Sequence, residues 1–256
     1  MIAPSRPGGR RTAVWGLAAL LLAVFSACRA RSGGPAAPPA FDWRFAIGGT
    51  LFRDDFTAGL GQWTIEAERP GRIEARNGRL EIDVPAGCTV WFRSKLSGPV
   101  MIEYRAAAIG AGGPNDRVSD LNCFWMAADS RAPGDIFARR RSGAFADYDL
   151  LTTYYVGLGG NGNTTTRFRR YVGKAGNRPI DPKDDLRGAE NLLAANAEQT
   201  LRLVACDHLI QFYRDGKRLF ETVDPQPYRE GWFAFRTTQS HLEIRDFRVY
   251  RLVPTL

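Results

Sequence analysis

From Phe41 onward, apolar and polar residues alternate with a period of two, which predicts strands rather than helices. The clearest strand candidates are residues 79–84, 100–104, 200–205, 209–213, 232–235 and 242–244. Turns are predicted at Asn77-Gly78, Asp215-Gly216 and Glu230-Gly231. Helical character is confined to residues 189–197, a short stretch. Many short strands at close spacing predict a two-sheet sandwich or a barrel, with no second domain.

The first 40 residues have a different pattern. Arg6, Arg10 and Arg11 precede an apolar run over residues 13–25, which is shorter than the ~20 residues of a membrane-spanning helix. Residues 1–27 therefore read as a secretory signal peptide. Cys28 is the predicted lipid-modified first residue of a bacterial lipoprotein, although Phe25 stands where the lipobox motif usually has Leu. The alternative is a plain signal peptide with an incidental cysteine.

Residues 28–40 contain three prolines and no apolar periodicity, so we expect a flexible linker between the lipidated cysteine and a domain over residues 41–256. The predicted location is the periplasm or the cell surface of a bacterium, with the lipid anchor as the only membrane contact. Five basic residues precede residue 41, where no acidic residue lies. The domain thus carries 30 basic and 27 acidic residues, a net charge of +3, which argues against nucleic-acid binding.

Three cysteines remain in the domain. Cys88, Cys123 and Cys206 each lie in an apolar, strand-like segment, and we predict buried free thiols, with one disulfide as the alternative. There is no Cys-x-x-Cys spacing, and the two histidines are isolated. We predict no catalytic metal and no cofactor, but loop aspartates near residues 115–116 or 181–185 could hold a structural calcium ion.

Several short sequence motifs, taken in their order along the chain, resemble those of the concanavalin A-like lectin/glucanase superfamily. These motifs are residues 51–56 with Trp63, residues 77–82, residues 213–220 and residues 242–250. Residues 113–126 and 154–171 resemble an uncharacterised family of exported bacterial proteins within that superfamily. The resemblance implies an all-β, concanavalin A-like jelly-roll sandwich of two antiparallel sheets, and a role connected with polysaccharide, without naming a reaction.

The segment from Tyr154 to Tyr171 is the most informative part of the sequence about candidate functional residues. Residues 159–163, Gly-Gly-Asn-Gly-Asn, suit positive backbone dihedrals and predict a hairpin or wide loop. In the second arm, Arg167, Arg169 and Tyr171 alternate with Phe168, which we expect to be buried. Two guanidiniums about 7 Å apart on one face repel unless an anion lies between them. That anion is either a substrate carboxylate or one of the loop acids Asp116, Asp120, Asp147 and Asp149.

Aromatic and polar residues share faces on three predicted strands. Asn122, Phe124 and Met126 alternate with apolar neighbours, and on a jelly-roll sheet their face would line a concave groove where sugars stack. Core packing is the alternative for any single tryptophan. The predicted substrate-binding residues are Arg167, Arg169, Asn122, Asn161, Asn163, Trp91, Arg93, Phe124, Trp232 and Arg236.

Glycoside hydrolysis ordinarily needs two carboxyl groups at a defined separation. The laminarinase-type motif Glu-x-Asp-x-x-Glu is not matched here: Glu81-Ile82-Asp83 fits its first three positions, but Ala86 stands where the motif ends in Glu. Elimination needs a cation or amide to neutralise a uronate, a base and an acid. The catalytic candidates are Tyr154, Tyr155, Tyr171, His241 and Asp120.

The leading hypothesis is a lipoprotein enzyme that cleaves an acidic, uronate-containing glycan by β-elimination. Two alternatives stay open. One is a carbohydrate-binding lipoprotein without catalysis, and the other is a glycoside hydrolase that uses Asp120 with Asp116 or Asp147.

Overall fold

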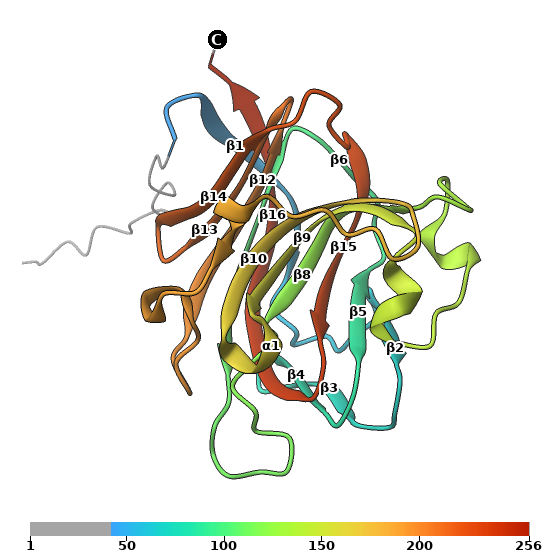
Figure 1. Ribbon diagram of the computed structural model, residues 1–256, viewed down its shortest axis with the longest axis vertical. Coiled ribbons are helices and arrows are strands. Elements are labelled where there is room, and N and C mark those ends of the chain that lie inside the picture. The colour runs from blue at the N-terminus through green and yellow to red at the C-terminus, as the bar shows by residue number, and fades with distance from the viewer. Residues whose placement is uncertain (1–41, 256) are drawn as a thin grey trace, which may run out of the picture. The chain divides into compact units, whose positions relative to one another are not determined.

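The computed structural model describes residues 42–255. The predicted signal peptide, Cys28 and the predicted linker lie outside the described residues. Two antiparallel eight-stranded sheets build the domain, which confirms the predicted jelly-roll sandwich (Figure 1). Within residues 42–255, no helix is both long enough and apolar enough to cross a bilayer.

Sheet A has the order β14-β13-β12-β7-β16-β4-β3, with β1 paired to β16. Its strands are β1 (Phe45–Asp54), β3 (Arg72–Arg76), β4 (Arg79–Val84), β7 (Val100–Ala108), β12 (Gln199–Cys206), β13 (Leu209–Arg214), β14 (Lys217–Val223) and β16 (Ser240–Pro254). Sheet B has the order β11-β10-β9-β8-β15-β5-β2, with β6 paired to β15. Its strands are β2 (Trp63–Ala67), β5 (Cys88–Phe92), β6 (Leu96–Ser97), β8 (Asn122–Asp129), β9 (Leu151–Gly159), β10 (Thr165–Val172), β11 (Asp185–Leu186) and β15 (Glu230–Thr237).

Two of the three predicted turns are present. Asn77-Gly78 and Asp215-Gly216 have positive φ at both positions and join β3 to β4 and β13 to β14. The turn predicted at Glu230-Gly231 is wrong, because these residues begin β15. Gly231 allows a close approach of two strands instead, since an added Cβ would lie 2.3 Å from the Met126 carbonyl carbon.

The predicted helix over residues 189–197 shortens to a single 3-10 turn, η4 (Ala189–Asn191). The backbone of Leu192 is already extended, and Asn196 has a positive φ of 59°. The segment therefore ends its helical turn after three residues.

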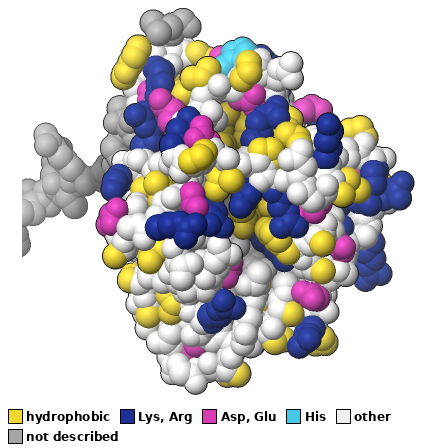
Figure 2. All heavy atoms as spheres, in the orientation of Figure 1, with side chains coloured by type: hydrophobic (Ala, Val, Ile, Leu, Met, Phe, Trp, Pro, Cys, Tyr) yellow, Lys and Arg dark blue, Asp and Glu magenta, His cyan; other side chains and the backbone are white. Residues whose placement is uncertain are grey.

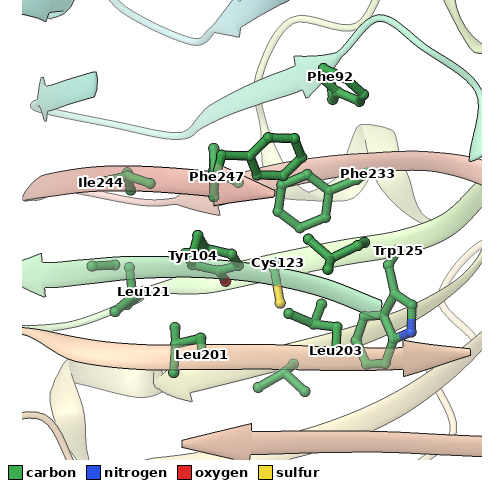
Figure 3. Close-up of a cluster of buried hydrophobic side chains, with 14 of the residues drawn as sticks. Phe92, Tyr104, Leu121, Cys123, Trp125, Leu201, Leu203, Phe233, Ile244 and Phe247 are labelled. Atoms are coloured by element: carbon green, nitrogen blue, oxygen red, sulfur yellow. The ribbon is translucent and has the colours of Figure 1, made fainter. Parts of the chain in front are cut away.

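The core lies between the two sheets, where Trp125 and Phe233 from sheet B meet Tyr104 and Phe247 from sheet A (Figure 3). Burial of one large apolar side chain contributes about 1.5–3 kcal/mol. Cys88, Cys123 and Cys206 are buried and free, which confirms the first of the two alternatives for the thiols.

A bulge in β8 reverses the expected alternation. Asn122 and Phe124 lie on the outer face of sheet B, but Met126 has a φ of 51° and joins the core between the sheets. The pairing with β9 shifts register between Trp125 and Ala128. The prediction that Met126 shares a face with Asn122 and Phe124 is therefore wrong, because the extra residue of a bulge inverts the faces beyond it.

The outer face of sheet B is covered by residues 130–149, here called the cover segment. It contains η1 (Ile136–Ala138) and η2 (Phe145–Tyr148). Ile136 and Tyr148 form a second apolar cluster with Trp91, Phe124 and Trp232 of the sheet.

Candidate functional site

A pocket of about 270 Å³ lies on the outer face of sheet B, beside the cover segment. Its lining residues are Asp120, Asn122, Phe145, Tyr155, Gly157, Gly160, Asn161, Thr165, Arg167, Arg169, Arg178 and Thr238. The structure thus brings together six of the predicted site residues: Asp120, Asn122, Tyr155, Asn161, Arg167 and Arg169. Figure 2 shows Lys and Arg side chains beside hydrophobic side chains near the middle of this face.

The pairing of β9 with β10 places the two arginines. Arg167 lies opposite Gly157 and Arg169 opposite Tyr155, while Phe168 points into the core, as predicted. Gly157 leaves space in front of the tyrosine, since an added Cβ would lie 3.0 Å from the Tyr155 hydroxyl oxygen. The absence of a side chain at residue 157 therefore leaves room on the floor of the pocket.

The predicted glycine-asparagine loop is the tight turn α1 (Gly160–Asn163), with φ of 55° at Asn161 and 62° at Asn163. Asn161 lines the pocket, and its amide donates to the Thr165 hydroxyl at 3.3 Å. Asn163 does not line the pocket. Its amide donates to the Leu193 carbonyl and accepts from the Leu193 N–H, both at 2.9 Å, so it holds a neighbouring loop.

The two predicted arginines have different partners. Arg167 donates to both carboxylate oxygens of Asp185, at 2.7 and 3.1 Å, and Asp185 was not among the four acids expected to pair with it. Arg169 has no carboxylate partner among residues 42–255, and it donates to the backbone carbonyl of Arg178. The alternative that Asp116, Asp120, Asp147 or Asp149 pairs with either arginine is therefore wrong, although Arg167 does pair with an acid of the same chain. Asp185 takes Arg167 because β11 lies directly beside β10.

Asp120 is the only acidic residue among those that line the pocket. Oδ2 accepts from the hydroxyls of Ser119 at 2.8 Å and Thr238 at 2.9 Å. Oδ1 accepts only a long hydrogen bond, 3.3 Å, from Asn122. The Asn122 Oδ1 atom is buried and has no hydrogen-bond partner among residues 42–255.

The three candidate tyrosines lie at three different places in the structure. Tyr155 lines the pocket, and burial raises its pKa well above the ordinary 10, so the phenol is neutral. Tyr171 lies under the cover segment, where burial raises its pKa to about 12, and its hydroxyl has no partner in the described part of the chain. Tyr154 points to the opposite face and lies in the core, where its hydroxyl donates to Asp224 at 2.7 Å. Adjacent residues of a strand face opposite sides, so Tyr154 cannot join Tyr155 in the pocket.

His241 lies on β16 of sheet A and does not line the pocket. Its Nδ1 is 2.8 Å from Asp116 Oδ1, and its Nε2 is 3.0 Å from Glu81 Oε1. Asp147 accepts two hydrogen bonds from Ser142, at 2.7 Å each. Neither Asp116 nor Asp147 lines the pocket, so neither supplies a second carboxyl group beside Asp120.

The open aromatic groove expected on sheet B is absent among the described residues. Trp91 and Phe124 are fully buried beneath the cover segment, and Trp232 is 5% exposed. Arg93 is exposed outside the pocket and donates to Thr64 at 3.1 Å. The buried Arg236 donates to the Gly143 carbonyl at 2.5 Å, while its Nε and Nη2 have no partner among the residues that the structure describes. The cover segment occupies the place of the predicted groove.

Arg178 and Phe145 complete the pocket, and sequence reasoning missed both. The Arg178 guanidinium lies 4.2 Å from the centre of the Phe145 ring and is ion-paired with Asp149. Phe145 begins η2 and Arg178 lies in the loop after β10, and no periodicity in the sequence marks either residue.

Within the described part of the chain, no group of three or more His, Cys, Asp or Glu side chains is arranged to hold a metal ion. In the loops considered for calcium, Asp116 accepts from the backbone N–H groups of Ala111 and Gly113. Asp185 pairs with Arg167 and Arg187.

The fold defines the class of protein: a jelly roll of the concanavalin A-like and galectin-like type. The chain belongs to a family described as a domain of unknown function (DUF6250), whose model matches residues 82–247. A search of curated proteins found no match.

Solved structures of the same fold come from proteins of low sequence identity. A protein of unknown function with a galectin-like fold from Bacillus subtilis has 18% identity and a TM-score of 0.63, over 82% of this chain and 99% of that chain. β-Agarase A from Zobellia galactanivorans has 12% identity and a TM-score of 0.55, over 88% and 98%. The metal-free carbohydrate recognition domain of Emp46p has 16% identity and a TM-score of 0.51, over 75% and 88%.

Proposed function

We propose that this protein is a cell-envelope lipoprotein, anchored through Cys28, that binds an acidic glycan in the pocket and cleaves it by β-elimination. A carbohydrate-related function is supported by the fold, which β-agarase A and the Emp46p carbohydrate recognition domain share. The observation that carries the proposal is Arg169, a guanidinium in the pocket wall without a carboxylate partner among residues 42–255.

The substrate carboxylate would lie against Arg169, beside the neutral donors that line the pocket. An ion pair with a guanidinium is geometrically well suited to a carboxylate. Neutralising that carboxylate increases the acidity of the proton on the neighbouring carbon, which is the first requirement of elimination. Asn161, an exposed residue of the pocket lining, would orient the sugar through hydrogen bonds.

Asp120 is the proposed base and Tyr155 the proposed acid. The Asp120 Oδ1 atom has spare acceptor capacity, and Tyr155 keeps its proton because burial raises its pKa. Asp120 takes the proton beside the uronate carboxylate as the carbon–carbon double bond forms. The glycosidic carbon–oxygen bond breaks, its electron pair stays on the leaving oxygen, and Tyr155 donates a proton to that oxygen. The products are an unsaturated uronate and a free sugar hydroxyl.

Carbohydrate binding without catalysis is the second candidate. It is favoured by the pairing of Arg167 with Asp185, because the described residues then leave one guanidinium of the pocket lining, Arg169, and not two to neutralise a substrate carboxylate. Hydrolysis by paired carboxylates has less support, because Asp120 is the only acidic lining residue.

The test is incubation of the purified protein with pectic, alginate and glucuronan-type polymers. We expect the ultraviolet absorbance of an unsaturated uronate to increase, and we expect Arg169→Ala and Tyr155→Phe to lower the rate at least about 100-fold. Arg139→Ala is the matched control, since Arg139 is exposed on the cover segment and lines a different cavity. New reducing ends without absorbance would indicate hydrolysis, and retention on an affinity gel with neither signal would indicate a binding module.

A further inference from the structure

We infer that the pocket takes the end of a glycan chain and not an internal stretch of the polymer. This inference rests on the proposed function and specifies its substrate class. The observations behind it are the walls that the protein's own segments place around the pocket.

The first wall is the cover segment. A polymer that crossed sheet B from β10 to β5 would have to pass over Phe124 and Trp91, which are both fully buried. Tyr148 stacks on Phe124 with ring centres 5.5 Å apart, and Phe137 meets Trp232 edge-on at 6.1 Å. The aromatic surface that could hold further sugars is therefore occupied by side chains of the same chain.

The cover segment is fastened to the sheet by buried charges. Arg141, whose side chain is 1% exposed, bridges Glu66 at 3.0 Å and Asp129 at 3.4 Å. Glu66 also accepts from Trp91 Nε1 at 2.8 Å and from the Tyr148 hydroxyl at 2.9 Å. Displacement of the segment would leave these buried charges without their partners, so displacement by a bound polymer is unfavourable.

The second wall joins the cover segment to the other side of the pocket. Arg178 reaches from the loop after β10, covers the Phe145 ring at 4.2 Å, and pairs with Asp149 of the cover segment. The α1 turn also contributes Gly160 and Asn161 to the lining. A volume of about 270 Å³ is below the ~300–1,000 Å³ of typical ligand pockets and suits one sugar ring.

The experiment varies the number of chain ends at constant polymer mass. The substrate polymer is partly depolymerised by mild acid to a series of decreasing mean lengths, and binding and initial rate are measured for each with the full-length mature protein. Halving the mean length doubles the ends, so we expect the signal at subsaturating concentration to double. We expect the first products to be monosaccharides.

Two results would overturn the inference. A signal that depends on polymer mass and not on the number of ends, with long oligosaccharides as first products, would overturn it and leave the proposed function intact. Absence of both binding and product for every polymer and oligosaccharide would overturn the proposed function, and this inference with it.

Phe145→Ala tests the wall directly. We expect the ratio of the signal from short chains to that from long chains, at equal mass, to decrease several-fold as the pocket opens toward Arg236. Arg139→Ala is the matched control, because Arg139 lies on the same segment, is exposed and lines a different cavity, and we expect it to leave the ratio unchanged. An unchanged ratio in a folded Phe145→Ala protein would overturn the assignment of this side chain as the wall.

Discussion

Replacement of Glu66 by Gln tests how the cover segment is held on sheet B. Glu66 is 8% exposed, and its carboxylate accepts from Trp91, Tyr148 and Arg141. Glutamine has nearly the same shape but no charge, and one of its two terminal atoms is a donor. At least one of these donors then faces another donor, and Arg141 loses its closest counter-charge.

The expected cost follows from the partners that remain. Breaking a buried ion pair by removal of one partner costs about 3–5 kcal/mol. Asp129 stays 3.4 Å from the Arg141 guanidinium, which places the expected loss near the lower limit, about 3 kcal/mol. For a domain of this size, that loss corresponds to a decrease in Tm of roughly 6–12 °C.

Urea denaturation and calorimetry measure the loss. Glu230→Gln is the matched control, because Glu230 pairs with Lys95 at 2.5 Å but its side chain is 61% exposed. A surface pair contributes at most about 1 kcal/mol, so the control should change Tm little. If Glu66→Gln loses no more stability than Glu230→Gln, the buried network does not fasten the cover segment, and the first wall of the pocket loses its support.

Three further predictions follow from single contacts. Gly157→Ala should fold with a Tm close to that of the parent protein but bind ligand about ten-fold more weakly, because the new Cβ lies 3.0 Å from the Tyr155 hydroxyl. Gly49→Ala is the control and should bind ligand normally, because its new Cβ meets no atom within 4 Å. The pKa of Tyr171 is raised to about 12 in the folded state, against about 10 when unfolded, so unfolding releases its proton above about pH 10. Urea denaturation should therefore show stability that is intact below pH 10 and is lost as the pH increases toward 12, and Tyr171→Phe should reduce that slope. Burial raises the pKa of Cys88 and of Cys123 to about 12. Both thiols should therefore resist a disulfide reagent in the native protein and react with it after denaturation. Rapid labelling of either cysteine in the native protein would contradict its burial.

Most of the strands could be predicted from the sequence because one physical cause, burial of alternate side chains, sets both the pattern and the structure. Arg79–Val84 is such a case, since its residues alternate between the core and the outer face of sheet A. The same rule placed Arg167 and Arg169 on one face opposite Phe168. The alternation rule failed at Met126, because a bulge shifts the alternation through a backbone conformation that cannot be predicted from the residue type.

The surroundings of the site could not be predicted in the same way. Trp91 and Trp232 have the pattern of residues that face a groove, and their neighbours on the sheet do lie on the outer face. What covers them is a 20-residue segment without periodicity, held by contacts such as Glu66 with Tyr148 that are 82 positions apart in sequence. The partner of Arg167 was missed for a related reason, since β11 has only two residues.

The remaining polar groups on this face explain why the pocket, and not the covered aromatic surface, is the candidate site. Under the cover segment, the indole N–H of Trp91 has an internal acceptor. Asn122 lines the pocket, and its Oδ1 is one of the nine buried side-chain atoms without a partner among the described residues. The Tyr171 hydroxyl and Nε and Nη2 of Arg236 also lack a partner there, but these side chains do not line the pocket. Each buried polar atom left unpaired costs about 1–3 kcal/mol. A surface used only for packing gains nothing from an unpaired acceptor such as Asn122 Oδ1, whereas a ligand hydroxyl that donates to this atom in the pocket would recover part of that free energy on binding.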